Sequence, residues 1–214
     1  MPLPLVISNL FSNKTNEQKD VISEFEGRLK SFTPQAAFAH AIIFARGRGL
    51  ADMSFLYPKL GQLVIADKIT FDLNQALKGL TVDALTCLPI VEALLGYAQE
   101  RNNLTTLSIT IPCHMNSEDL AKLSAILEKF FTAPPSKLAS IALTLAPGAG
   151  LLSPTAISSI MHAATRADSN LHITLTRVPL PITRIAAGST MRLILIDCPK
   201  VISENKARAE KKYN

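Results

Sequence analysis

Four short segments of alternating apolar and polar residues dominate the second half of this 214-residue chain, and a proline closes each of them. In order they read LTTLSITIP from Leu104, LASIALTLAP from Leu138, LHITLTRVP from Leu171 and MRLILIDCP from Met191. Such alternation is typical of a β-strand with one buried face. Proline has no amide hydrogen to give to a β-ladder, so it marks where pairing stops. The chain is therefore predicted to hold four strands with defined ends.

Amphipathic helices are predicted in the two longer gaps between these strands. In the first gap, Asn116 or Ser117 can cap a helix whose apolar residues recur at helical spacing. In the second gap, Ser153 can cap a helix and Pro154 suits its first position. The unit of strand, turn and helix repeats at about 34 residues, a period that indicates a solenoid. The connection after Pro179 is too short for such a helix, so the last unit is truncated.

The first part of the chain is predicted to be a helical cap over residues 1–59. Thr15 can cap one helix, and Thr33, followed by a proline, can begin a second helix that ends at Gly47 or Gly49.

An earlier repeat unit is predicted between the cap and the first Pro-closed strand. We expect its strand in LGQLVIADK from Leu60 and its helix in the segment from Thr81, where Pro89 either kinks the helix or marks its first turn. The repeats then span residues 60–200, and residues 201–214 form a charged tail.

The strand pattern also discriminates between two α/β architectures. A parallel sheet covered by helices on both faces has nearly continuous apolar strands. These strands alternate instead; the first places Leu107, Ile109 and Ile111 on one side and Thr106, Ser108 and Thr110 on the other. One sheet face is thus expected to be buried and the other exposed, as in a helix-backed solenoid. A single twisted α/β domain with one exposed sheet face satisfies the same pattern.

The leucine spacing resembles the leucine-rich-repeat family, in particular its ribonuclease-inhibitor-like type. That family's core is L-x-x-L-x-L followed by x-x-N or x-x-C, and the positions that fit it are Leu60, Leu63 and Ile65; Leu104, Leu107 and Ile109; Leu138, Ile141 and Leu143; and Leu193, Leu195 and Cys198. In the other units the Asn or Cys position holds Lys68, Pro112, Ala146 and Val178. The resemblance implies an α/β solenoid with a parallel sheet on the concave face and helices on the convex face. Short repeats between a helical cap and a basic tail also resemble leucine-rich-repeat effectors of intracellular bacterial pathogens.

The outward residues of the strands form a candidate binding surface. Alignment of the strands at their second apolar position gives three ladders, which are Thr106, Ser140, His172 and Arg192; Ser108, Ala142, Thr174 and Ile194; and Thr110, Thr144, Thr176 and Ile196. Most of these side chains are small, and the surface becomes basic and apolar at the last strand, a composition found at interface cores. We therefore expect a non-enzymatic module that binds a partner protein through this face. The effector resemblance implies a host or bacterial partner whose activity is inhibited or redirected.

Catalytic and cofactor-binding motifs are weak in this sequence. The loop Pro147–Gly150 lacks the Lys and the Ser or Thr of a phosphate cradle, so we interpret its glycines as turn residues. Cys113 beside His114 is the alternative hypothesis, a thiol-dependent hydrolase or transferase. Adjacent residues of an extended chain point to opposite sides, and no third group that would orient the imidazole is identifiable. The scattered Cys and His residues show no metal-ligand spacing, so we expect no metal and no cofactor.

The excess of positive over negative charge lies near the end of the sequence. Residues 1–165 carry thirteen Lys and Arg against thirteen Asp and Glu, whereas residues 166–214 carry nine against four. The sequence has no tryptophan and no aromatic residues interleaved with this basic region, so a specific nucleic-acid site is not expected. A tail that binds an anionic surface is a third class of function, and a small-molecule ligand is not expected.

Cysteine usage and hydropathy give an expectation for the compartment. Three scattered cysteines, Cys87, Cys113 and Cys198, do not suit a disulfide framework. The first residues lack the pattern of a cleavable signal peptide, and no apolar run approaches the roughly 20 residues of a membrane span. We expect a soluble protein of a reducing compartment such as the cytoplasm, and the effector resemblance adds export into a host cell without a cleavable signal.

Overall fold

The computed structural model describes residues 15–63, 67–101, 103–146, 152–165, 171–178, 180–181, 193–196, 198 and 200–201. Its elements alternate between helices and strands, which confirms the predicted α/β class.

In the N-terminal part the described residues form α1 (Asn16–Arg28), α2 (Pro34–Gly47) and the 3-10 helix η2 (Ser54–Leu63). Thr15 begins α1 with a capping box, in which its hydroxyl accepts from the Gln18 amide and the Gln18 side chain accepts from the Thr15 amide. The Thr33 hydroxyl caps α2 by accepting from the Ala36 amide at 3.3 Å. The 3-10 helix extends to Leu63, and the cap boundary at residue 59 stays a prediction.

Five parallel strands form one sheet in the order β1-β2-β3-β4-β6. They are β1 (Lys68–Asp72), β2 (Thr106–Ile111), β3 (Ser140–Leu145), β4 (His172–Thr176) and β6 (Leu193–Ile196). The two-residue strands β5 (Leu180–Pro181) and β7 (Lys200–Val201) pair with each other outside this sheet. The strands of the main sheet therefore lie side by side in chain order, and the last four are the Pro-closed segments of the sequence.

The helices that follow the strands begin at side-chain caps. They are the short α3 (Leu73–Ala76), α4 (Ala84–Glu100), α5 (Ser117–Thr132) and α6 (Pro154–Thr165). Asn116 caps α5, and the Ser153 hydroxyl accepts from the Ala156 amide at 3.1 Å to cap α6. Asp83 caps α4, so Pro89 lies inside this helix and not in its first turn.

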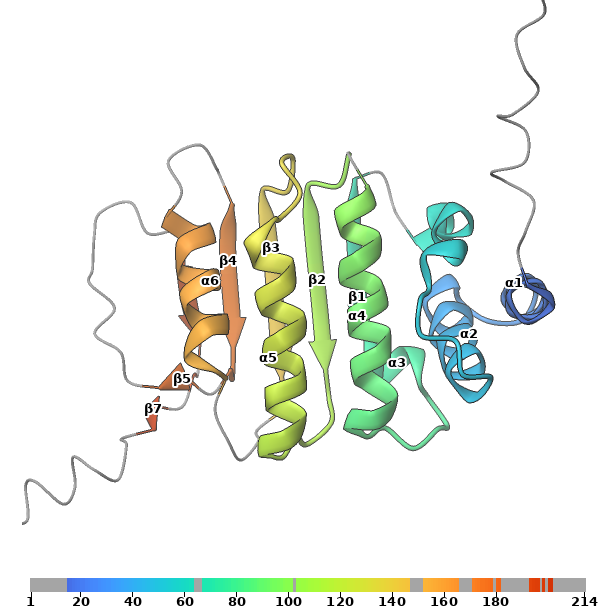
Figure 1. Cartoon of the computed structure of the whole chain (residues 1–214), viewed down its shortest axis with the longest axis horizontal. Coiled ribbons are helices and arrows are strands. Elements are labelled where there is room, and N and C mark those ends of the chain that lie inside the picture. The colour runs from blue at the N-terminus through green and yellow to red at the C-terminus, as the bar shows by residue number, and fades with distance from the viewer. Residues whose placement is uncertain are drawn as a thin grey trace, which may run out of the picture.

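Helices α4, α5 and α6 lie side by side over one face of the sheet, as Figure 1 shows. The other face is free of helices within the described residues. Burial alternates along β2 and β3 in the same way, because Leu107, Ile109, Ile141 and Leu143 point into the helix layer and are buried. The predicted arrangement of one buried and one exposed sheet face is confirmed.

The predicted strand from Leu60 is wrong. Leu60 lies in η2, and the strand begins later, at Lys68. Leu60 is fully buried in the core from this 3-10 helix. Ile69 and Phe71 instead supply the inward residues of β1, where they pair with residues of β2. The match of Leu60, Leu63 and Ile65 to the repeat pattern therefore does not mark a strand, and Ile65 lies outside the described residues.

A single hydrophobic core joins the helical part to the sheet. Phe38 of α2 packs edge-on against Phe71 of β1, with ring centroids 5.9 Å apart. Val21 and Phe25 of α1 are fully buried in the same core. The N-terminal helices therefore lie at the β1 end of the sheet (Figure 1), whereas the strand order places β6 at its opposite edge.

Candidate functional site

The helix-free face of the sheet carries the residues that the sequence places on a binding surface. The partners across β2, β3 and β4 are Thr106, Ser140 and His172; Ser108, Ala142 and Thr174; and Thr110, Thr144 and Thr176. Strand β6 continues two of these ladders with Ile194 and Ile196. The predicted register is confirmed for these residues, and Arg192 lies outside the described part of the chain.

Exposure on this face is lowest in the middle strands β2 and β3 and higher at both edges, since Lys68 and Thr70 of β1 are exposed as well. The Ser and Thr side chains of β2 and β3 are half-buried, because strands about 4.8 Å apart shield short side chains from solvent. His172 is exposed, and Ile194 and Ile196 are 52% and 44% exposed. Leu195 on the opposite face of β6 is also exposed. The β6 edge therefore offers apolar surface on both faces of the sheet.

Strand β1 extends the ladders with three residues that sequence analysis did not assign to the surface. Lys68, Thr70 and Asp72 pair with Thr106, Ser108 and Thr110. The alternation in KITFD was the available signal, but the expected strand nearer Leu60 concealed it. The sheet face therefore has charged residues at its β1 edge and apolar residues at its β6 edge.

Carboxylates near the sheet and helix ends serve as hydrogen-bond acceptors for the fold. Asp67 accepts from the Thr105 hydroxyl, and the Asp72 and Asp83 carboxylates accept backbone amides at the starts of α3 and α4. The hydrogen bonds from Thr105 and Thr86 hold the pKa of Asp67 and of Asp83 below the ordinary value. A general acid at neutral pH needs a raised pKa, so these carboxylates suit structural roles.

Cys113 and His114 do not form a catalytic dyad in this geometry. The Cys113 side chain is buried beside Cys87 of α4, whereas His114 is exposed. The hydrogen bond between the two thiols lowers the pKa of Cys113, against the effect of its burial, and raises the pKa of Cys87, where burial acts in the same direction. A reactive cysteine is a partly exposed thiolate, and these buried side chains do not provide one.

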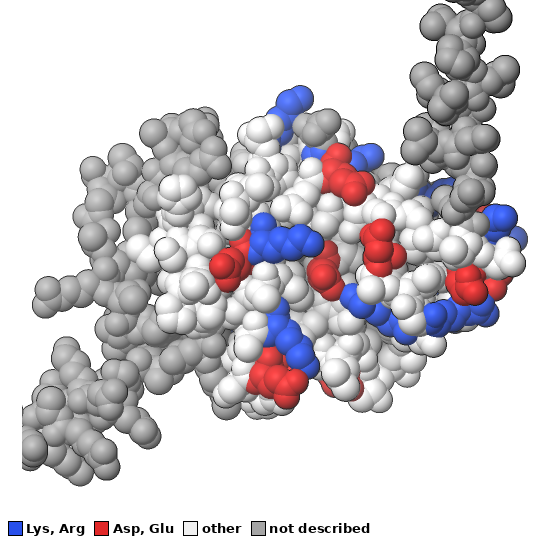
Figure 2. Space-filling model, viewed as in Figure 1, with Lys and Arg blue, Asp and Glu red and all other residues white. Residues whose placement is uncertain are grey.

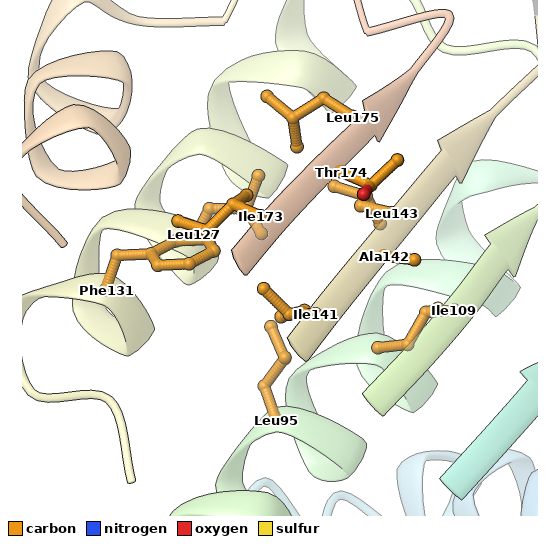
Figure 3. Close-up of a pocket in the computed structure, with 10 residues that line it drawn as sticks. All are labelled: Leu95, Ile109, Leu127, Phe131, Ile141, Ala142, Leu143, Ile173, Thr174 and Leu175. Atoms are coloured by element: carbon orange, nitrogen blue, oxygen red, sulfur yellow. The ribbon is translucent and has the colours of Figure 1, made fainter. Parts of the chain in front are cut away.

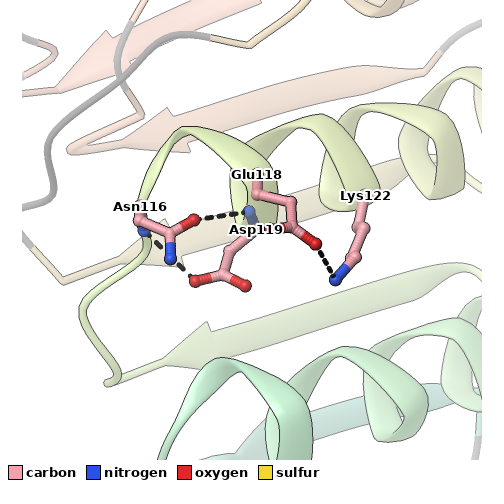
Figure 4. Close-up of polar contacts among 4 residues, drawn as sticks. All are labelled: Asn116, Glu118, Asp119 and Lys122. Atoms are coloured by element: carbon pink, nitrogen blue, oxygen red, sulfur yellow. Dashed lines mark hydrogen bonds and ion pairs between the residues drawn. The ribbon is translucent and has the colours of Figure 1, made fainter.

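The polar side chains at the start of α5 are engaged in hydrogen bonds and an ion pair within this helix (Figure 4). The Asn116 side chain accepts from the Asp119 amide at 2.9 Å, and the Asp119 carboxylate accepts from the Asn116 amide at 3.2 Å. Lys122 pairs with Glu118 at 2.7 Å. Both acidic residues of this first turn are thus engaged in helix capping and in an exposed i, i+4 pair.

The polar groups at the start of α6 also have hydrogen-bond partners within the protein. Ser153 donates its amide to the Ser124 hydroxyl at 2.9 Å, while its own hydroxyl accepts from Ala156. The loop Pro147–Gly150 lies outside the described residues, so the turn interpretation of its glycines stays a prediction.

A small cavity lies in the core between the sheet and the helix layer (Figure 3). Its volume is about 10 Å³, and aliphatic and aromatic side chains such as Leu95, Phe131 and Ile173 line most of it. This volume is about that of a single water site, and a water there needs polar partners. The cavity is a packing defect and not a ligand site.

A much larger hollow lies on the outside of the helix layer, where sequence analysis assigned no function. This helix-layer groove has a volume of about 470 Å³ and is lined by Arg46, Ala84, Leu85, Leu88, Pro89, Glu92, Lys122, Ala125 and Ile126. Its residues come from α2, α4 and α5, and only the fold brings them together. Groove volumes of this size are typical of binding sites.

A second cavity of about 400 Å³ adjoins the groove and shares Arg46, Pro89 and Glu92 with it. Tyr57 of η2 lies in this second cavity, and its hydroxyl packs so closely against Gly96 of α4 that a Cβ there would clash. Burial, reinforced by the charge of Glu100, raises the pKa of Tyr57 to about 12.

Charged side chains of both signs are intermixed over the helix layer, with uncharged surface between them, as Figure 2 shows. The described residues hold no cluster of three or more His, Cys, Asp or Glu that would bind a metal ion. None of the described helices combines the length and hydropathy of a transmembrane segment. Comparison with protein-family models, curated proteins and solved structures finds no match to this chain.

Proposed function

We propose that the chain is a leucine-rich-repeat-like solenoid that binds a partner protein through the helix-free face of its sheet. The observation that carries this proposal is the aligned array of small polar side chains on that face, bordered by the exposed Ile194 and Ile196. The strand and helix units that repeat in chain order support the solenoid.

The two edges of this face suit different parts of an interface. Complete burial of an isoleucine side chain contributes roughly 1.5–3 kcal/mol, so covering the exposed halves of Ile194 and Ile196 contributes about 1 kcal/mol each. The Ser and Thr hydroxyls both donate and accept hydrogen bonds and give specificity without bulk. Since the strands are already paired, little backbone conformational freedom is lost when the partner binds.

A non-enzymatic role fits the site better than thiol catalysis. The alternative hypothesis needs Cys113 and His114 to act on one substrate, and the Cys113 side chain is buried whereas that of His114 is exposed. The effector role, with a host or bacterial partner, stays a prediction that rests on the resemblance of the sequence.

Affinity capture from lysate with mass-spectrometric identification tests the proposal. The Thr144→Arg, Thr174→Arg double variant places two long cationic side chains in the middle of the sheet face. The matched control is Ala121→Arg, Ser158→Arg, which adds the same charge at exposed positions of α5 and α6. Circular dichroism verifies that both proteins are folded.

We expect a partner that the unmodified chain and the control variant capture and the sheet-face variant loses. A chain that lacks residues 201–214 retains the same partner if the sheet face is the site, and loses it if the basic tail is. Capture that persists in the sheet-face variant refutes the proposal.

A further inference from the structure

We propose that the helix-layer groove is the binding site for residues 1–14 of the same chain. The proposal does not depend on the sheet face, because the groove lies on the opposite side of the helix layer.

The groove suits an apolar and uncharged occupant. Leu85 is 74% exposed at its wall, and the neighbouring Leu88 and Ile126 are aliphatic. The charges at its rim are already neutralised, since Arg46 pairs with Glu92 at 2.9 Å and Lys122 pairs with Glu118 of α5. A ligand that carries charge therefore gains little there, whereas an aliphatic one covers exposed side chains.

Residues 1–14 have this composition. The segment reads MPLPLVISNLFSNK and carries six large aliphatic or aromatic side chains, no Asp or Glu and one Lys. Its two prolines favour an extended backbone. The other terminal stretch, residues 202–214, reads ISENKARAEKKYN and is mostly polar and charged. Of these two stretches, only residues 1–14 match an apolar groove.

The segment ends close enough to the groove to reach it. The Glu17 carboxylate near the start of α1 lies within the electrostatic influence of Arg48, and Asp20 pairs with Arg48 at 2.6 Å. Arg48 is two residues from Arg46, which lines the groove. Thr15 is five residues from Asp20, which is about 7.5 Å at a helical rise of 1.5 Å per residue, and the Asp20–Arg48 pair leads from there toward Arg46. Fourteen extended residues span about 45 Å.

One backbone hydrogen bond of α4 is missing beside the groove. Pro89 lies inside α4 and has no amide hydrogen, so the Leu85 carbonyl receives no i+4 hydrogen bond. Both residues line the groove. A backbone amide of an extended segment can satisfy this carbonyl.

Paramagnetic relaxation in the full chain tests the proposal. A nitroxide is attached to Ser8→Cys in a Cys198→Ser background, where Cys87 and Cys113 are buried and stay unlabelled. We expect loss of the methyl signals of Leu88 and Ile126, while the Ile194 methyl signal on the distant sheet edge is retained.

The test also separates the other occupants of the groove. Signal loss that occurs only when labelled chains are mixed with isotope-enriched, unlabelled ones assigns the groove to a second copy and overturns the proposal. Absence of signal loss overturns it as well and leaves the groove to another partner.

Two variants localise the contact. Leu85→Glu changes an exposed side chain of the groove, so the protein stays folded while the signal loss at Ile126 disappears. Leu80→Glu, at a leucine that is 42% exposed and does not line the groove, leaves the signal loss intact. Signal loss that survives Leu85→Glu refutes the location.

Discussion

Ser124→Ala tests the hydrogen bond that links two neighbouring helices of the layer. Ser124 of α5 is almost fully buried; its hydroxyl donates to the Leu120 carbonyl at 2.6 Å and accepts from the Ser153 amide at 2.9 Å. Alanine leaves the Ser153 amide, at the cap of α6, without its acceptor. An unsatisfied, partly buried amide costs about 1–3 kcal/mol. The helix propensity of alanine offsets about 0.5 kcal/mol, so the expected loss of unfolding free energy is about 1 kcal/mol.

Urea denaturation of the full chain measures this loss, and a fall in the melting temperature of about 2–4 °C accompanies it. Ser158→Ala is the matched control, because Ser158 is an exposed serine inside α6 and alanine there gains helix propensity only. The two variants should therefore change stability in opposite directions. Equal stabilisation by both substitutions refutes the inference that Ser124 joins α5 to α6.

Three further predictions follow from burial and pKa. Phe71→Ala should lower the unfolding free energy by about 3–5 kcal/mol and Thr70→Ala by little, as measured in urea; the reverse order contradicts the placement of β1. The folded-state pKa of Tyr57 is raised from its ordinary value near 10 to about 12, so its contribution to stability is full below pH 10 and is lost as pH rises toward 12; Tyr57→Phe should remove this dependence in alkaline denaturation curves. In the folded protein a thiol reagent should modify Cys198 quickly and Cys113 only after unfolding, and rapid reaction at Cys113 restores the thiol-enzyme hypothesis.

The strands after residue 103 were predictable because two local signals agree there. Alternation sets the face of each side chain, and a closing proline sets the strand end, so the register of the ladders followed from alignment alone. The helix starts at Thr15, Thr33 and Ser153 were predictable for a similar reason, since a capping side chain acts within three residues.

The first strand and the groove were not predictable in this way. The run from Leu60 is apolar enough for a strand, but its first residues, up to Leu63, lie in a 3-10 helix that buries Leu60 in the core. The short segment Lys68–Asp72 forms the strand because its inward residues pair with β2. The groove depends on how α4 packs beside α5. Its residues on these two helices are some forty positions apart in the sequence, so no local sequence pattern predicts the groove.

The order of the strands in the sheet, which follows the order of the chain, also has a consequence for how the protein unfolds. Each strand of the main sheet pairs only with its neighbours in sequence, and α5 lies between α4 and α6, so contacts stay local along the chain. Opening can then begin at the β6 edge and move inward one unit at a time. Amide hydrogen exchange should be fastest at Leu193–Ile196, slower in β4 and slowest in β2. The local free energy of unfolding would then rise from the β6 edge toward β2, and the domain would not unfold as one cooperative unit.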